Sequence, residues 1–341
     1  MANITFTEGS GLNDSIYGKS QQPIRLFIEK KGEAFEEESM LPHLFCMENS
    51  NHFGEKFTSM TAMDGFSPVG ENGASPVDGM QESYTKFFEH MTWKDSFSLS
   101  REIVEDSKLI DLRKKPSAFV TGYYRTRERF GSALYSGAME LKSKVAFGGR
   151  EFDITCADGK ALFSTGHTSK LNSKTQANLF ADEFSADALA ACECQMQNFR
   201  GDNGELLCVI PDTIMIPNNY ELKKAVFSVI GAECDPATSN NGYNYHFGRW
   251  NVVVNPYLDV TGNYWILMDS KYNRENAGAV WLDRTPLDVR SVVDDNTSAN
   301  IWYGYARFIA GFNDWRFAAI GGIAVGNTLV KTTTTTTTTG N

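Results

Sequence analysis

The most regular hydrophobic pattern in the chain lies between residues 116 and 147. Pro116 suits a first helical turn there, and Gly148-Gly149 suits a stop. The apolar side chains recur at spacings of four and seven, as on one face of an α-helix: Phe119, Tyr123, Phe130, Leu134, Leu141 and Val145. Such a helix would be about 48 Å long, well beyond the usual length. The pattern predicts one long helix that backs a sheet.

The first part of the chain predicts an arm. Residues 1–31 are polar and punctuated by glycine, and their apolar patch from Ile24 to Ile28 shows no sustained period, so we expect an extended segment. A short helical stretch from Glu33 to Phe45 follows, interrupted by Pro42.

Residues 53–102 predict a long two-stranded β-ribbon, with one arm from Phe57 to Phe66 and a second arm in which Trp93, Phe97 and Leu99 alternate with small or polar residues. The connection, residues 67–79, is rich in Gly and Pro and has no large side chain, which predicts a projecting tip. The arms carry many aromatic residues: Phe57, Phe66, Tyr84, Phe87, Phe88, Trp93 and Phe97. A solvated ribbon does not tolerate so much apolar surface, so we expect it to lie on a neighbouring subunit.

The second half of the chain mixes short helices and strands, which predicts an α+β fold in two lobes. Ser185 caps a predicted helix to about Phe199, and a second helix covers 220–230. Strands are predicted at 206–210, 213–216, 250–254, 264–268, 280–282 and 287–293, with a final hairpin of 301–312 and 315–320 around Asn313-Asp314. The run Thr332–Thr339 predicts a flexible tail.

Composition narrows the class of protein. Of 341 residues, 41% are hydrophobic, which excludes global disorder, and no apolar run reaches membrane-spanning length. The N-terminus lacks the pattern of a signal peptide, so we expect folding in the cytoplasm. The formal net charge is -10, and the densest basic residues lie among acidic ones: Arg113, Lys114, Lys115, Arg125, Arg127 and Arg129. Dedicated nucleic-acid binding is therefore not expected.

Candidate chemistry is sparse. The six cysteines form no CxxC pair, so reduced and mostly buried thiols are expected at Cys46, Cys156, Cys192, Cys194, Cys208 and Cys234. The five histidines show no metal-binding spacing, and no phosphate-binding loop occurs. Ser164 and His167 lie close together, but no GxSxG turn surrounds the serine. We expect no catalytic, cofactor or metal residues, and a protein whose work is contact with its own copies.

Three segments resemble the major capsid proteins of tailed bacteriophages. REIVEDSKLIDLRKKPSAF (101–119) resembles the family's passage from ribbon to long helix. DGKALFSTGHTS (158–169), with Asn178 downstream, is similar to a loop of the Mu-like major head subunits. ARFIAGFNDWRFAAIGG (306–322) resembles the C-terminal strand pair. Their order matches over about residues 30–325, and the resemblance is to the HK-ninety-seven fold, closest to the Mu-like subunits.

The resemblance implies six segments along the chain. They are an N-terminal arm with a short helix (1–52), an extended β-ribbon loop (53–102), a peripheral domain with the spine helix (103–155), a central axial domain (156–300), peripheral return strands (301–325) and a flexible Thr-rich tail (326–341).

The implied function is a major capsid protein that forms pentamers and hexamers in an icosahedral shell around double-stranded DNA. The implied partners are a separate scaffolding protein, a portal, a decoration protein in some shells, and DNA held without sequence-specific binding; no membrane is involved. The implied location is the virion, after assembly in the bacterial cytoplasm. Because residues 67–79 contain no lysine, covalent cross-linking is not expected. An encapsulin-type shell protein and, more remotely, a Ser/His hydrolase that uses Ser164 and His167 are the alternatives.

Overall fold

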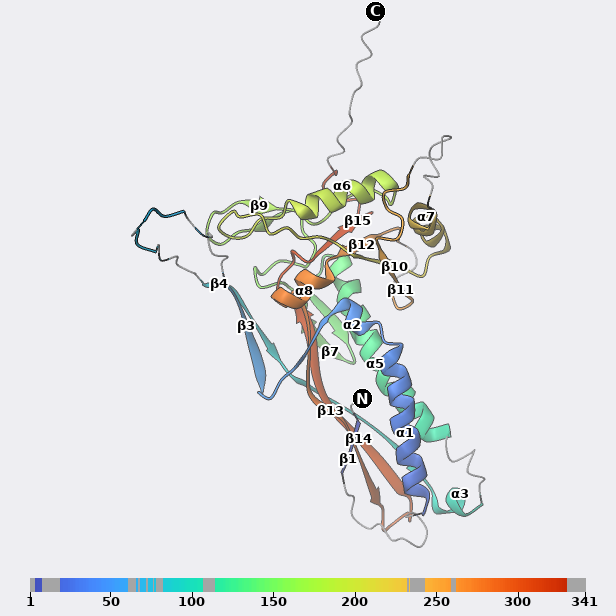
Figure 1. Ribbon diagram of the computed structural model, residues 1–341. Coiled ribbons are helices and arrows are strands. Elements are labelled where there is room, and N and C mark those ends of the chain that lie inside the picture. Colours follow the sequence, from blue (N-terminus) through green and yellow to red (C-terminus); the bar gives the residue numbers. More distant parts are fainter. Residues whose placement is uncertain are drawn as a thin grey trace, which may run out of the picture. The chain divides into compact units, whose positions relative to one another are not determined.

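The structure is a computed structural model in which helices and sheets are mixed, as the α+β prediction requires (Figure 1). It describes residues 4–7, 19–60, 66, 68–71, 73–75, 77, 82–106, 114–231, 233, 243–258 and 262–329. The chain divides into two compact units, each made of three segments. The first unit comprises Met1–Glu55, Phe87–Gly131 and Val280–Ala310, and the second comprises Lys56–Lys86, Ser132–Ala279 and Gly311–Asn341.

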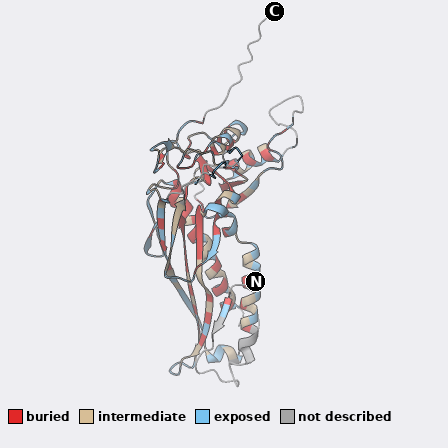
Figure 2. Ribbon diagram, turned by 60° about the vertical axis from the view of Figure 1, so that its left-hand side comes forward, coloured by how far each residue is buried: buried red, intermediate tan, exposed pale blue. Residues whose placement is uncertain are grey.

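A five-stranded sheet is the frame of the first unit. Its long central strands are β13 (Ala279–Val293) and β14 (Asn300–Phe312), and β5 (Met91–Leu99) pairs antiparallel with β14. On the other side of β13, two short strands pair with it in parallel, β2 (Cys46–Asn49) near its start and β1 (Ile4–Thr7) further along. Buried residues follow the long strands in Figure 2.

Helices α1 (Lys19–Glu37) and α5 (Lys114–Met139) lie side by side against this sheet in the first unit (Figure 1). Helices α2 (Leu41–Leu44) and α3 (Arg101–Asp106) are short. One apolar core joins α1, α5 and the strands; its buried members are Ile4, Ile24, Ile28, Leu99, Phe119, Val120, Tyr124, Leu287, Val289 and Trp302. Burial of these side chains, each contributing ~1.5–3 kcal/mol, holds the long helix on the sheet.

Helix α1 corrects the prediction of an extended arm over residues 1–31. Ile24 and Ile28 are one helical turn apart, and both are buried in the core of the first unit. Most of the helix surface is polar, so the periodic signal is too short to read from sequence. Tertiary packing of two isoleucines and the half-buried Phe35 stabilises a helix that propensity alone would not.

The long helix is also shorter than predicted, because it ends at Met139 rather than near Phe147. Strands β6 (Lys144–Phe147) and β7 (Arg150–Asp153) follow and pair antiparallel. Gly148 and Gly149 form the two-residue turn between them, with φ of 58° and 77°. Positive φ at both central positions is what a tight hairpin turn requires, so the glycine pair is a hairpin signal rather than a helix stop.

The ribbon consists of β3 (Gly54–Met60) and β4 (Glu82–Glu89), which form a separate two-stranded sheet. The prediction that its second arm extends to residue 102 is wrong. Strand β5 belongs to the large sheet, where Leu99 pairs with Asn300 and Met91 with Phe308. Of the predicted tip, residues 67–79, the structure describes 68–71, 73–75 and 77.

A four-stranded sheet lies at the centre of the second unit, in the order β11-β10-β12-β15. The strands are β11 (Asn251–Asn255), β10 (Thr213–Pro217), β12 (Trp265–Met268) and β15 (Ala318–Gly321). Every residue of β10, β12 and β15 is buried. The unit also contains helices α6 (Ala186–Gln197), α7 (Tyr220–Ile230) and α8 (Ser270–Asn276), and the short strand pair β8 (His167–Thr168) and β9 (Thr175–Gln176).

Several predicted elements of the second half are confirmed, and two are wrong. The Ser185 hydroxyl caps α6 by accepting from the Ala188 amide, and α7 covers residues 220–230 as predicted. Residues 206–210 form no strand beyond one isolated bridge at Leu206. The predicted final hairpin does not form, because β14 pairs with β13 and β5 whereas β15 pairs with β12. Of the predicted flexible tail, residues 326–341, the structure describes 326–329, and the prediction is wrong for these: Asn327 forms a bridge with Phe180, and Leu329 is buried. The Thr run lies outside the described residues.

Candidate functional site

The DGKALFSTGHTS segment folds around the buried ring of His167. Nδ1 of this ring lies 2.6 Å from Oδ2 of Asp158, and both side chains are almost fully buried. Nε2 lies 3.2 Å from the Leu162 carbonyl oxygen and 3.2 Å from Oδ1 of Asn178. The ring stacks on Trp315, with centroids 4.3 Å apart. The histidine is therefore enclosed on both edges and one face.

Asn178 completes this cluster and joins it to strand β15. Its amide nitrogen donates to the Leu162 carbonyl at 2.8 Å and to the Ala318 carbonyl at 3.0 Å. Its Oδ1 accepts from the Ser164 amide at 2.9 Å. Because the asparagine is fully buried and bonded on every side, it holds the loop against the end of the central sheet. The motif taken from the resemblance thus forms a structural junction inside the second unit.

The Asp158 carboxylate is the charged member of the junction. Burial opposes its ionisation, but hydrogen bonding and charge from His167, together with the Lys160 amide and side chain, hold its pKa below the ordinary value. The carboxylate therefore stays ionised inside the loop and fixes the imidazole in one orientation.

The hydrolase alternative required Ser164 and His167 to act together. The Ser164 hydroxyl accepts a hydrogen bond from the Gly166 amide at 3.2 Å. The imidazole nitrogens instead face Asp158, Leu162 and Asn178, and the hydrogen bonds of the described residues include none between the imidazole and the serine hydroxyl. An imidazole with both nitrogens engaged elsewhere is not placed to take a proton from this serine.

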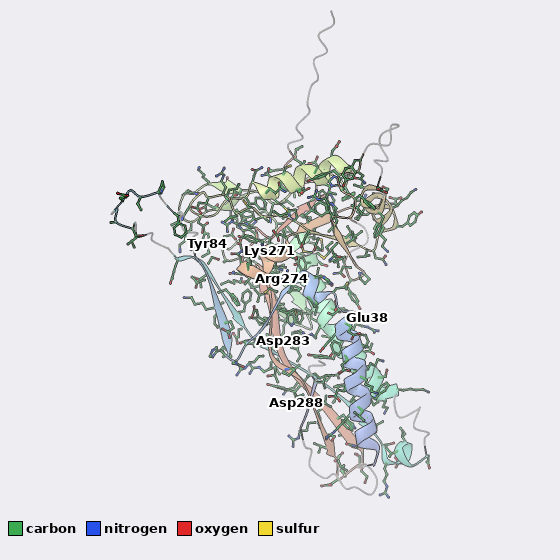
Figure 3. The ribbon with its side chains drawn as sticks, viewed as in Figure 1. Glu38, Tyr84, Lys271, Arg274, Asp283 and Asp288 are labelled. Carbon is green, nitrogen blue, oxygen red and sulfur yellow. The ribbon has the colours of Figure 1, made fainter. Side chains whose placement is uncertain are left out.

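Strand β4 of the ribbon is anchored to the same loops of the second unit. The Lys86 ammonium contacts Asp153 in an ion pair and donates to Thr155 Oγ1 at 3.0 Å. The Tyr84 hydroxyl donates to the Thr168 carbonyl at 3.2 Å, and Figure 3 places Tyr84 on this strand. Ser83 donates to a carboxylate oxygen of Asp202. The face of β4 that carries Tyr84 and Lys86 is therefore packed on its own chain.

The aromatic residues assigned to the ribbon differ in their surroundings, and Phe57 on β3 and Tyr84 on β4 are half-buried. Trp93 and Phe97 lie on β5 inside the first unit, where Trp93 stacks on Phe308 at 4.8 Å and Phe97 on Trp302 at 5.9 Å. Phe88 is only 5% exposed. Phe87 and Phe66 remain open to solvent, at 55% and 110% exposure. Of the seven aromatic residues, Phe66 and Phe87 are exposed, Phe88 is buried, and the other four are half-buried. The prediction that this aromatic surface belongs to the ribbon is wrong for Trp93 and Phe97, and burial of the exposed remainder on a neighbouring subunit stays a prediction.

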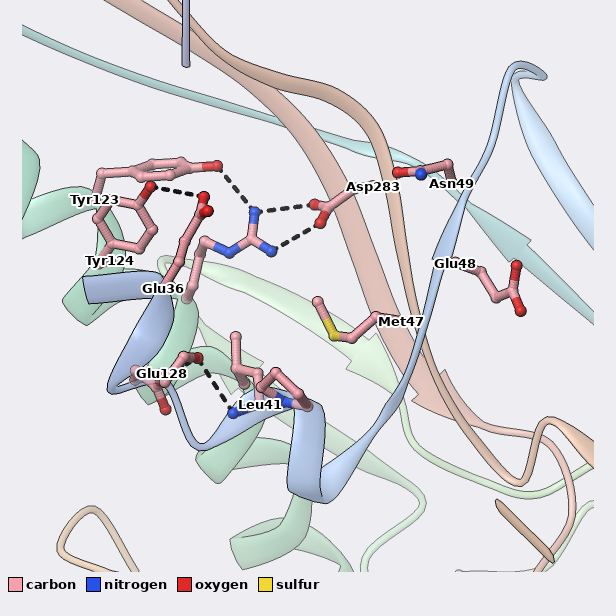
Figure 4. Close-up of a pocket in the computed structure, with 12 residues that line it drawn as sticks. Glu36, Leu41, Met47, Glu48, Asn49, Tyr123, Tyr124, Glu128 and Asp283 are labelled. Atoms are coloured by element: carbon pink, nitrogen blue, oxygen red, sulfur yellow. Dashed lines mark hydrogen bonds and ion pairs between the residues drawn. The ribbon is translucent and has the colours of Figure 1, made fainter. Parts of the chain in front are cut away.

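A pocket of about 290 Å³ lies in the first unit, beside the guanidinium of Arg127 on α5 (Figure 4). Arg127 donates from Nη1 to Asp283 Oδ1 at 3.0 Å and from Nη2 to Asp283 Oδ2 at 2.7 Å. Nη1 also donates to the Tyr123 hydroxyl at 3.0 Å. The guanidinium lies 4.9 Å from the Trp281 ring. Burial acts to lower the pKa of Arg127, but Tyr123 and Asp283 outweigh it and raise the pKa.

The opposite wall of the pocket attaches α1 and α2 to α5. The Tyr124 hydroxyl donates to Glu36 Oε1 at 3.0 Å. Oε1 of Glu128 accepts from the Ser39 hydroxyl at 2.6 Å and from the Met40 amide at 3.1 Å, so a residue of α5 caps the start of α2. Burial raises the pKa of Glu128 despite these donors. The hydrogen bonds and the ion pair around the pocket therefore connect α1, α2 and β13 to α5.

Sequence reasoning found the His167 loop but missed the Arg127 pair. Arg127 and Asp283 are 156 residues apart, and Arg127 was visible only as one member of a basic group. The one available signal was the spacing of four between Tyr123 and Arg127, which places both on one helix face. In the described part of the chain, no group of three or more His, Cys, Asp or Glu side chains could hold a metal ion.

The structure also bears on the predictions for the cysteines and for membrane-spanning helices. Cys46, Cys156 and Cys192 are buried, whereas Cys194 and Cys208 are exposed; Cys234 lies outside the described residues. No helix in the described ranges has the length and hydrophobicity needed to cross a bilayer.

Comparison with known proteins gives one family. A family model described as phage capsid protein matches residues 83–321. A search of curated proteins finds no match.

Several solved structures are similar to this chain at low sequence identity. The capsid structure of the cyanophage P-SCSP1u is 10% identical, with a TM-score of 0.50 over 82% of this chain and 86% of that chain. A structure from Mycobacterium phage Patience is 10% identical, with a TM-score of 0.48 over 97% and 95%. A virus-like particle from Pyrococcus furiosus is 6% identical, with a TM-score of 0.46 over 88% and 97%.

Proposed function

Because the chain belongs to the phage capsid protein family, we propose that its copies form the pentamers and hexamers of an icosahedral shell around double-stranded DNA. The protein is a major capsid protein with the HK-ninety-seven type of fold, and it forms the shell of the virion. The family match over residues 83–321 carries this conclusion, since it spans both compact units. Membership of this family indicates a structural role rather than a catalytic one.

We assign the two units to the two domains of such a subunit. The first unit, with the long helix and the five-stranded sheet, is proposed as the peripheral domain, and the second as the axial domain at the centre of each capsomer. Strands β3 and β4 are proposed as the extended loop that reaches a neighbouring subunit. Support comes from Phe87 on β4, which exposes apolar surface while Tyr84 on the other face is packed, and from the exposed Phe66 in the connection between β3 and β4.

The remaining partners follow from the capsid role. A net charge of -10 suits a wall that must not adhere to packaged DNA, because an acidic surface repels phosphates. We propose a separate scaffolding protein, a portal, and assembly in the host cytoplasm, with decoration proteins as further partners of the outer surface. Residues 67–79 contain no lysine, which argues against covalent cross-links from the tip.

The ribbon supplies the direct test of self-assembly. Replacing residues 67–79 by a two-residue Asn-Gly turn should leave the far-UV circular dichroism unchanged, because the packed face of β4 is untouched. Particle formation, measured by sedimentation and electron microscopy with scaffold supplied where required, should fall sharply. A variant that assembles like the parent would rule out the ribbon as the clasp between subunits.

The contents of purified particles test the DNA proposal separately. Nuclease-protected double-stranded DNA inside particles from infected cells is the expected result. Particles that hold a protein cargo and no DNA would instead favour the encapsulin-type alternative.

A further inference from the structure

A three-residue hydrogen-bond chain closes the base of the ribbon. His90 is the single residue between β4 and β5, and Ser50 directly follows β2, so both lie where the chain enters or leaves the large sheet. Nε2 of His90 lies 2.8 Å from the Ser50 hydroxyl oxygen, and that hydroxyl donates to Glu55 Oε1 at 2.6 Å. His90 and Ser50 are 4% and 3% exposed. Glu55 lies on β3, so these hydrogen bonds link the start of β3 to the residue that follows the end of β4.

The hydrogen-bond donors and acceptors of these three residues determine the tautomer of His90. A carboxylate only accepts, so the single proton of the Ser50 hydroxyl is directed to Glu55. The serine oxygen can then only accept from the imidazole, and Nε2 must carry the proton. Nδ1 consequently bears a lone pair, and it is buried with no hydrogen-bond partner among the described residues.

A proton added at Nδ1 would meet an unfavourable environment. Arg284 on β13 and Arg307 on β14 face the ring with positive charge, whereas Glu55 and Asp283 face it with negative charge. Asp283 is already bonded by both prongs of Arg127, and Glu55 by Ser50. The new N–H would be a buried donor without an acceptor. Burial is the main cause that lowers the pKa of His90, and the two arginines add to it.

We propose that His90, Ser50 and Glu55 form a proton-operated latch at the ribbon base, closed while the imidazole is neutral and released when Nδ1 is protonated. The latch makes the ribbon base sensitive to acid through one histidine. A protonated His90 ring has no buried acceptor for its Nδ1–H in the described part of the chain, so it must move toward water, which breaks the hydrogen bond to Ser50. Its consequence for the shell rests on the proposed function, in which the ribbon joins neighbouring subunits.

Hydrogen–deuterium exchange of the full-length protein tests the latch, both in assembled particles and in dissociated subunits. After correction for intrinsic rates, peptides covering 50–57 and 86–92 should exchange about tenfold faster at about pH 5.5 than at about pH 7.5. His90→Gln keeps an N–H donor for Ser50 but cannot take a proton, so its exchange should change less than about twofold over this range. His52→Gln is the matched control, because His52 is an exposed histidine two residues after Ser50, between β2 and β3; it should behave like the parent.

Ser50→Ala provides a second variant that does not depend on His90→Gln folding. It removes both hydrogen bonds of the latch, so fast exchange at the ribbon base is expected already at neutral pH. A parent protein with the same exchange at both pH values, or a His90→Gln variant as acid-sensitive as the parent, overturns the latch. Because exchange is also read in dissociated subunits, that failure is separate from a failure to form shells, which would count against the proposed function.

Discussion

The side chains of Arg127 and Asp283 form a two-pronged ion pair that joins α5 to β13 within the first unit. Each is only 12% exposed, and the guanidinium also lies against the rings of Trp281, Phe308 and Tyr123. Asp283 lies in the first third of the long strand β13 (Figure 3). The pair therefore fixes where along the strand the helix is attached, which apolar packing alone specifies weakly.

Breaking this pair should be costly. Asp283→Asn leaves a buried guanidinium without its counter-charge, and we expect a loss of about 3 kcal/mol in the free energy of unfolding. The measurement is the shift of the denaturant midpoint. The exposed pair of Lys142 and Glu140, each 58% exposed, is the control, and Glu140→Gln should change stability by less than about 1 kcal/mol. Equal effects of the two substitutions would show that the Arg127 pair has no special role.

The junction around His167 predicts a stability change at low pH. The pKa of Asp158 is lowered in the folded protein, so the unfolded chain takes up its proton first as the pH falls. The contribution of Asp158 is therefore present above about pH 4 and is lost as the pH falls through the folded-state pKa.

Asp158→Asn removes this contribution, so the variant should melt below the parent at neutral pH and the gap should narrow below about pH 4. Thermal melts at a series of pH values measure it. A gap that is constant across the series would mean that the charge of Asp158 does not contribute.

The elements that sequence predicted well are those with local signals. Leu222, Val226 and Ile230 recur at a spacing of four and form the buried face of α7. Ser185 is a favourable N-cap residue and marks the start of α6. The choice of the strand with which another strand pairs has no such local signal. Trp93, Phe97 and Leu99 alternate as a strand should, but nothing local tells that the partner is β14, about two hundred residues away, rather than the ribbon.

The candidate site shows the same division. Asp158 and His167 are nine residues apart within one motif, so the resemblance could draw attention to both. The Arg127 pair and the His90 chain join segments that meet only in the folded sheet, and a lone buried histidine between two strands carries no distinguishing pattern in sequence. Long-range pairing, rather than residue chemistry, limited the prediction.

Two glycines of α5 should respond to alanine with opposite signs. A β-carbon at Gly122 meets no atom within 4 Å, so Gly122→Ala should stabilise by about 0.5–1 kcal/mol through helix propensity. At Gly131 the β-carbon would lie 2.7 Å from Leu41 Cδ2 and 3.0 Å from Phe45 Cε2. Gly131→Ala should destabilise by about 1–3 kcal/mol, because overpacking outweighs propensity. Melting temperatures that rise for both variants would show that Leu41 and Phe45 can move enough to accommodate the added methyl group.

Adjacent phenylalanines on β4 separate assembly from folding. Successive side chains of a strand point to opposite faces, and Phe87 is 55% exposed whereas Phe88 is 5% exposed. Phe88→Ser should lower the free energy of unfolding by about 3 kcal/mol or more, as for a large core truncation.

Phe87→Ser should cost the isolated subunit less than about 1 kcal/mol, because most of its ring is already in water. If the ring is buried on a neighbour in the shell, its loss removes ~1.5–3 kcal/mol from each such contact, and a shell repeats that contact many times. Particles should then form only at higher protein concentration and should dissociate at lower denaturant concentration, while subunit melting stays close to the parent. Unchanged assembly in Phe87→Ser, with Phe88→Ser destabilised as expected, would place the intersubunit contact elsewhere than on the exposed face of β4.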